Sequence, residues 1–191
     1  FIPDRNGDDK PDGPAETLLD GWGHQDQHET LNSFIWGPDG WLYGCHGVFT
    51  HSRVGKPGTP PEERAIINAA IWRYHPTRKV FEKFAEGTSN PWGVDFDENG
   101  QMFIEACVIP HLWYVVQGAR YHRQGGQHEN KYTFDDIKTI ADHKQDGTQG
   151  GKGGHAHGGA RFVLNDVFPA EYRNKFIVGT IHHHGMYTES F

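Results

Sequence analysis

The chain has 191 residues, with 25 glycines, 11 prolines and 13% aromatic residues, a composition typical of a loop-rich β protein rather than a helical one. Its formal net charge is -7, and acidic and basic residues are interspersed, so the sequence has no basic patch for a nucleic acid and that class of partner is excluded. No stretch approaches the roughly 20 apolar residues that a membrane-spanning helix needs.

The N-terminal loop predicts a calcium site. Side-chain oxygens alternate along it, and the backbone carbonyl group of Lys10 lies between them; the side chains belong to Asp4, Asn6, Asp8 and Asp12. Alternating oxygen ligands on a tight loop suit a hard cation such as Ca²⁺. The match to an EF-hand loop is partial, so an acidic turn without a metal ion is the alternative.

Two hairpin patterns sixty residues apart are the most regular feature of the chain. Residues 34–43 (FIWGPDGWLY) read as a strand, a turn with an acidic residue before glycine, and a second strand, and residues 94–103 (VDFDENGQMF) repeat this order. In this register Trp36 and Phe96 occupy equivalent positions in the first strand of each hairpin. A repeat of this kind predicts the blades of a β-propeller.

The fold class is therefore expected to be all-β, with four strands in each blade. Residues 1–21 would end a preceding blade and carry the calcium-like loop, residues 32–86 would form a complete blade, residues 92–142 a second blade with a polar insertion, and residues 160–191 the start of a third. The expected strands include Ala69–His75, Arg161–Leu164 and Lys175–Ile181, whereas Ile137–Asp142 is expected to be either a strand of the second blade or a helical turn. About two and a half blades cannot close a ring, so the working unit is expected to be larger, through a longer chain or through assembly.

Most histidines are expected on one face of this array. Loops after the second and fourth strands of a blade share that face, and they carry His24, His28, His46, His51, His111, His143, His155, His157, His182, His183 and His184. Histidine binds metals and titrates near neutral pH, so the face is a candidate functional face. The alternative is that long loops are simply polar. His155 and His157, two residues apart, could hold zinc or copper with the 182–184 run.

The two cysteines, Cys45 and Cys107, fall late in the second strand of each hairpin. They could form a disulfide between neighbouring blades if the protein is exported. Buried free thiols are the alternative.

Three segments carry a resemblance to a known family: residues 28–44 (HETLNSFIWGPDGWLYG), 87–103 (GTSNPWGVDFDENGQMF) and 155–182 (HAHGGARFVLNDVFPAEYRNKFIVGTIH). They resemble the bacterial glucose/sorbosone dehydrogenase-type propellers, and most of all the branch labelled membrane-bound dehydrogenases. The resemblance implies a six-bladed propeller in the periplasm or otherwise outside the cytoplasm, possibly attached to a membrane through other parts. It also implies calcium, pyrroloquinoline quinone on the top face, oxidation of a sugar or alcohol, and a cytochrome that accepts the electrons.

The resemblance also assigns catalytic residues. His28, ahead of the first strand of the hairpin, resembles the general base that takes the hydroxyl proton of the substrate while hydride passes to the quinone. Asp26 or Glu29 is close enough in sequence to support it.

Four residues are expected to contact the cofactor or shape its site. Asn90 resembles a cofactor-contacting asparagine, and Ser89 stands where these enzymes carry an arginine. His155 and His157 would complete the site. Because serine supplies no charge for an acidic cofactor, the alternative function is a non-catalytic, calcium-stabilised propeller that binds carbohydrate or a protein partner.

Overall fold

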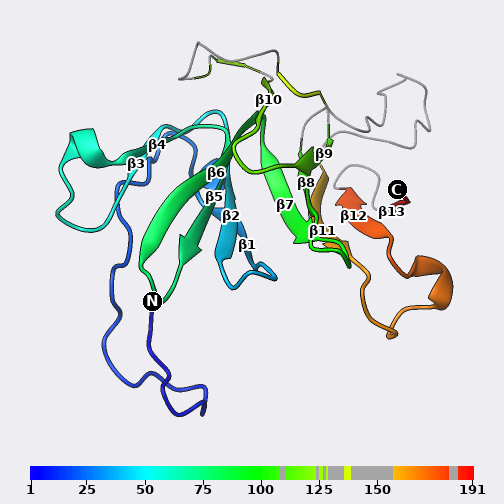
Figure 1. The fold of residues 1–191 in the computed structure, drawn as a ribbon, viewed down its shortest axis with the longest axis horizontal. Helices are drawn as coiled ribbons and strands as arrows, with labels where there is room; N and C mark the ends of the chain where they lie inside the picture. Colours follow the sequence, from blue (N-terminus) through cyan, green and yellow to red (C-terminus); the bar gives the residue numbers. More distant parts are fainter. Residues whose placement is uncertain (108–110, 124, 127, 129–135, 139–156, 181–184) are drawn as a thin grey trace.

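The computed structural model describes residues 1–107, 111–123, 125–126, 128, 136–138, 157–180 and 185–191, and within them the fold is all-β, as expected (Figure 1). Among these residues, helical structure is limited to three short turns: α1 (Gln27–Thr30), η1 (Pro61–Glu63) and η2 (Ala170–Tyr172). The described sheets do not close into a ring. In the described part of the chain, no helix is long and apolar enough to cross a membrane.

The first sheet contains the four strands expected between residues 32 and 86, together with a fifth strand from later in the chain that was not expected in it. Its strands, in spatial order, are β1 (Asn32–Trp36), β2 (Leu42–His46), β5 (Ala70–His75), β6 (Val80–Thr88) and β10 (Arg120–Arg123). The first four pair antiparallel in sequence order. The excursion between β2 and β5 forms a separate two-stranded sheet from β3 (Ser52–Val54) and β4 (Ala65–Ile67).

The second sheet has three described strands: β7 (Pro91–Phe96), β8 (Met102–Ala106) and β9 (Leu112–Val115). Of the segment Ile137–Asp142, expected to add to this sheet, Ile137 forms an isolated parallel bridge with Tyr121 of β10 in the first sheet, and residues 139–142 lie outside the described residues. β10 in turn pairs parallel with β6.

The third sheet consists of β11 (His157–Phe162), β12 (Phe176–Thr180) and β13 (Gly185–Glu189), all antiparallel. It begins before the expected Arg161, because a bulge accommodates the glycines of β11, with Gly159 at a φ of 71°. The third strand, β13, was not expected from the sequence.

The hairpins share one pairing register. Trp36 lies opposite Leu42 in the first hairpin and Phe96 opposite Met102 in the second, which is what the sixty-residue repeat predicts. The third hairpin follows the same order, with Phe162 opposite Phe176 across a longer connection. Each of the three first strands also has a register irregularity near its start.

The three sheets pack face to face, in sequence order, through their first strands (Figure 1). β7 packs against β1 and β2, and β11 packs against β7 and β8. The core between the first two sheets includes Tyr43, Ile71, Phe96, Ile104 and Trp113. The core between the second and third sheets includes Phe103, Leu112, Ala160, Phe162 and Phe176.

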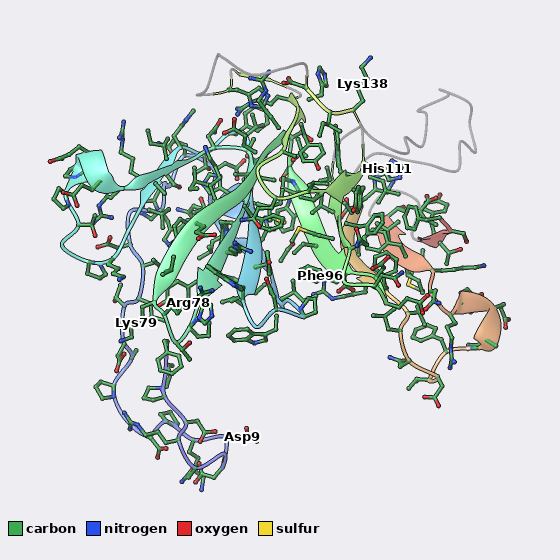
Figure 2. All side chains as sticks on the ribbon, viewed as in Figure 1. Asp9, Arg78, Lys79, Phe96, His111 and Lys138 are labelled. Carbon is green, nitrogen blue, oxygen red and sulfur yellow. The ribbon has the colours of Figure 1, made fainter. Side chains whose placement is uncertain are left out.

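This arrangement gives the sheets two distinct ends. We call the end where β1, β7 and β11 begin, and where β2, β8 and β12 end, the polar end. We call the opposite end, where short turns join β1 to β2 and β7 to β8, the turn end. In Figure 2 His111 marks the polar end and Phe96 the turn end.

Candidate functional site

Buried polar side chains gather at the polar end. Those with no more than 2% of their surface exposed are Glu29, His46, Thr50, Ser52, Thr88, Ser89, Glu105, His111 and His157. Burying a polar or ionisable group costs free energy unless it is paired, so such a concentration at one end of the sheets marks it as the candidate site.

Glu105 is the most unusual member of this set. It lies on β8, it is 0% exposed, and neither carboxylate oxygen has a hydrogen-bond partner among the described residues. Burial raises the pKa of Glu105 well above its usual value, which favours the protonated carboxyl group. The side chain fits because Gly93 lies opposite: a Cβ atom there would be 3.2 Å from Glu105 Oε2 and 2.8 Å from the Cβ atom of Ala160.

A second buried carboxyl group belongs to Glu29, in the single turn of α1. Asp26 caps this turn by accepting a hydrogen bond from the backbone N–H of His28 at 3.0 Å. Glu29 Oε2 accepts from the backbone N–H of Phe49 at 2.6 Å, whereas Oε1 has no partner among the described residues. A Cβ atom on Gly47 would lie 2.5 Å from the Glu29 carboxyl group, so this glycine makes room for it. Burial raises the pKa of Glu29.

Both cysteines lie near these carboxyl groups, and both are free thiols, so the disulfide alternative is wrong in this structure. Burial, followed by the charges of Glu105 and Glu29, raises the pKa of Cys107 to about 11. Burial, followed by the charge of Glu105, also raises the pKa of Cys45 above its ordinary value. We call Glu29, Cys45, Glu105 and Cys107 the carboxyl–thiol cluster. Because burial raises the pKa of each member, the cluster favours the protonated forms of its carboxyl and thiol groups.

A pair of buried histidines lies between the second and third sheets at the same end. The rings of His111 and His157 stack with their centroids 4.8 Å apart. His111 Nε2 lies 3.8 Å from Glu189 Oε1, and the backbone N–H of His157 donates to the carbonyl oxygen of Cys107 at 3.3 Å. The carboxyl–thiol cluster and the histidine pair are therefore linked through the backbone at Cys107.

The comparison with family models covers nearly the whole chain. Residues 1–186 match the model described as "Domain of unknown function (DUF7133)". The chain belongs to this family. A search of curated proteins found no match. The family description assigns no activity, so the chemistry is argued from the polar end itself.

The predicted base, His28, lies at the polar end but outside the carboxyl–thiol cluster. Its side chain is 87% exposed, and its Nδ1 atom lies 3.5 Å from Asp26 Oδ1, whose side chain is 38% exposed. Glu29, the next residue, is the one that points inward. Within the one-turn helix α1, Glu29 is buried and His28 is exposed.

The predicted cofactor residues are only partly available. Ser89 is 1% exposed, and the side-chain oxygen of Asn90 accepts a hydrogen bond from Trp92 Nε1 at 2.6 Å. His157 is described and buried, whereas His155 lies outside the described residues. The same is true of the other histidines at positions 143 and 182–184, so the zinc or copper hypothesis rests on positions that the structure does not describe. No group of three or more His, Cys, Asp or Glu side chains suited to a metal ion occurs among the described residues.

His46 has a structural role in this end of the first sheet. Its Nε2 atom lies 2.8 Å from Ser52 Oγ and its Nδ1 atom 2.9 Å from the carbonyl oxygen of Gly47. Ser52 Oγ also accepts from the backbone N–H of Gly23 at 2.8 Å. Burial lowers the pKa of His46 to about 4, so the ring is neutral at physiological pH and ties β3 to the end of β2.

The calcium-like loop lies well away from the polar end, in the N-terminal segment that extends below the sheets in Figure 1 and carries the Asp9 label in Figure 2. Its side-chain oxygens accept hydrogen bonds from backbone N–H groups of the same loop: Asp4 from Gly7, Asp8 and Asp9, Asn6 from Asp8, Asp8 from Lys10, and Asp12 from Arg5. The loop is thus held in a turn by its own acidic residues, and the calcium site stays a prediction.

Proposed function

We propose that the chain is part of a propeller-type oxidoreductase, located outside the cytoplasm, that oxidises a sugar or alcohol at the polar end. Three hairpins in one register, packed through their first strands, support the blade arrangement that the family resemblance implies. The observation that carries the proposal is the buried, unpaired carboxyl group of Glu105.

Glu105 has the chemistry that the reaction needs. Oxidation of an alcohol to a carbonyl group removes the hydroxyl proton and transfers the carbon-bound hydrogen, with two electrons, to an acceptor. A carboxylate whose pKa is raised by burial is a stronger base than one in water. Buried polar groups without partners are rare in folded proteins and concentrate at functional sites. We therefore assign Glu105, rather than the exposed His28, as the candidate base.

The described residues do not fit pyrroloquinoline quinone, an acidic cofactor that calls for guanidinium partners. Ser89 is buried and uncharged, and the side-chain oxygen of Asn90 is bonded to Trp92. Arg161, on β11, uses its Nη1 atom to bond the carbonyl oxygens of Val94 and Ala160. We therefore assign no step to the quinone and name the acceptor only by class, a two-electron carrier that is reoxidised by a cytochrome.

A second candidate function is a non-catalytic propeller that binds carbohydrate or a protein partner. The observation that favours it is the hydrogen bond from Trp92 to Asn90. This bond occupies the side-chain oxygen of Asn90, the residue that was expected to contact the cofactor. In that case calcium would act as a structural ion.

Both candidates require partners that cover the outer faces of the array. Trp36 on the first sheet is 60% exposed, and Met186 on the third sheet is 68% exposed. Large apolar side chains at the two open faces are suited to packing against further sheets. We propose that the remainder of a longer chain, or other subunits, supplies these sheets.

The test uses the full-length protein with calcium, an artificial two-electron acceptor and a panel of aldoses and alcohols. Glu105→Gln should lower kcat by the roughly 10² to 10⁴ that removal of a general base costs, whereas His28→Ala should stay within a few-fold of wild type. The wild-type rate should rise with pH through the raised pKa of Glu105.

The reverse pattern, with loss of activity only in His28→Ala, would return the role of base to His28. If the wild type fails to reduce the acceptor with every substrate of the panel but still binds a sugar, the binding propeller replaces the enzyme.

A further inference from the structure

A cavity of about 300 Å³ opens at the turn end, between the first and second sheets. It lies at the opposite end from the carboxyl–thiol cluster, and no function proposed above uses it. Its apolar walls come from both sheets and include Tyr43, Phe84, Phe96 and Met102. The ring of Tyr43 meets those of Phe84 and Phe96 edge-on, at centroid distances of 5.3 and 5.2 Å. A volume of this size falls at the lower end of the range for small-molecule sites.

A fixed polar group forms one side of the cavity. The hydroxyl group of Tyr43 donates to Asp39 Oδ2 at 2.7 Å, and Arg73 Nη1 donates to the Tyr43 hydroxyl oxygen at 3.3 Å. Burial raises the pKa of Tyr43 to about 12, so its hydroxyl proton is retained. Arg73 is held further by Glu82 Oε2, at 2.9 Å from Nε and 2.7 Å from Nη2, and its guanidinium carbon lies 4.1 Å from the centre of the Trp41 ring.

This polar group keeps hydrogen-bonding capacity for a ligand. The hydrogen bonds of Arg73 to Glu82 and Tyr43 use three of its five N–H groups, which leaves one on Nη1 and one on Nη2. The Asp39 side chain is 41% exposed and accepts from Tyr43 and from the backbone N–H of Trp41, so its carboxylate retains acceptor positions. A donor and an acceptor thus lie side by side, since Arg73 Nη1 is 3.6 Å from Asp39 Oδ2.

The charges around the cavity select against ionic ligands. An anion would meet the carboxylate of Asp39, and the single guanidinium group of Arg73 is already paired with Asp39 and Glu82. A cation would have to displace Arg73, which is fixed by both carboxylates and by the Trp41 ring. A neutral ligand with hydroxyl groups that both donate and accept has no such conflict.

We propose that the cavity binds a neutral sugar, with adjacent hydroxyl groups bonded to Asp39 and Arg73 and the apolar side of the ring against Phe84 and Phe96. Gln101 and Gln117 also line the cavity and supply amide groups for further hydroxyl groups. Because this site lies at the turn end, it would hold a carbohydrate independently of any reaction at the polar end.

The experiment is a titration of the full chain with glucose, galactose and maltose, followed by backbone amide NMR shifts and by calorimetry. We expect shifts confined to the residues around Asp39, Arg73 and Gln117. Asp39→Asn removes a charged acceptor while preserving shape, and it should weaken binding about tenfold or more. Arg73→Lys keeps the charge but loses the fork of N–H groups, and it should weaken binding as well.

The matched control is Asn99→Asp, at the position of the second turn that corresponds to Asp39, because Asn99 does not line the cavity. It should leave affinity unchanged. Three results would overturn the proposal: equal affinity in wild type and Asp39→Asn, sugar-induced shifts only at the polar end, or binding of inorganic phosphate in place of sugars. Circular dichroism on each variant shows that lost binding is not lost folding.

Discussion

The hairpins β1–β2 and β7–β8 share a register but not an environment. Trp36 and Phe96 hold the same position, sixty residues apart, yet Trp36 is 60% exposed and Phe96 is 8% exposed. The difference arises because the second hairpin lies between two sheets, whereas one face of the first is open. Backbone pairing fixes where a side chain points, and the neighbouring sheet decides whether it is buried.

The same comparison contrasts a buried side chain that has a partner with one that has none among the described residues. Cys45 and Glu105 are also sixty residues apart, on β2 and β8, and both are buried. The Cys45 thiol has a hydrogen bond with Ser33, whereas the Glu105 carboxylate has no partner among the described residues. An apolar side chain at position 105 would fit the fold better, so the carboxyl group is retained at a cost in stability.

The largest expected effect comes from Phe96. Phe96→Ala should lower the free energy of unfolding by about 3 to 5 kcal/mol, because it empties a position packed against Tyr43. Trp36→Ala, at the equivalent exposed position, should cost less than about 1 kcal/mol. Urea unfolding of both variants measures the contrast. Equal losses would mean that the open face of the first sheet is covered in solution.

The next effect depends on pH and concerns His46, whose counterpart in the second hairpin is the apolar Ala106. Its pKa is lowered from 6.5 to about 4, so the unfolded chain binds a proton that the folded chain does not. The stability that the neutral ring provides is present above pH 6.5 and is lost as the pH falls towards 4, by about 3 kcal/mol at most. Denaturant unfolding between pH 4 and 7 should show this slope in His28→Ala and a flatter one in His46→Gln. An unchanged slope in His46→Gln would contradict the assignment.

A smaller effect of opposite sign is expected at Glu105. Its pKa is raised in the folded state, so stability is present at low pH and falls as the pH rises above the usual value of 4.5. Glu105→Gln should therefore be more stable than wild type at pH 8, by about 1 to 3 kcal/mol, and similar to it at pH 4. Glu98→Gln, in the exposed turn of the same hairpin, is the control and should follow wild type. Destabilisation by Glu105→Gln at pH 8 would show that the carboxylate has a partner.

The hairpins could be predicted from the sequence because they are local. Each turn ends in a glycine with positive φ, Gly40 at 80° and Gly100 at 75°, and the apolar positions alternate on either side. The pairing of β10 with β6 is not local, and nothing in Arg120–Arg123 indicates a partner more than thirty residues away. The short strand β13 has too weak an alternation of apolar and polar residues to be recognised.

The candidate site was less predictable than the fold. The family resemblance directed attention to His28, but the one-turn helix α1 leaves His28 exposed and buries its neighbour Glu29. Glu105 did leave a signal in the sequence, because it is a single carboxylate within the apolar run of β8. The sixty-residue repeat alone identifies position 105 only as part of a strand. A charged residue that interrupts a buried strand is informative when the equivalent position in the other repeat, here Cys45, is uncharged.

The smallest effect concerns the acidic loop that precedes the first hairpin and has no counterpart ahead of the second. Asp4 and Asp8 accept backbone N–H groups of the loop, yet each carboxylate has lone pairs left for a cation. With a Kd of about 10⁻⁴ to 10⁻³ M, typical of exposed extracellular sites, 1 mM Ca²⁺ should stabilise the protein by about 0.4 to 1.4 kcal/mol. Asp8→Ala should abolish both this gain and the heat of binding in calorimetry. Asp9→Asn, which keeps a residue tolerant of the positive φ of 62° and changes no alternate ligand, is the control and should bind as wild type does. Identical calorimetric traces for wild type and Asp8→Ala would leave the loop as a turn held by its own side chains, and the two hairpins would then differ only in what packs against them.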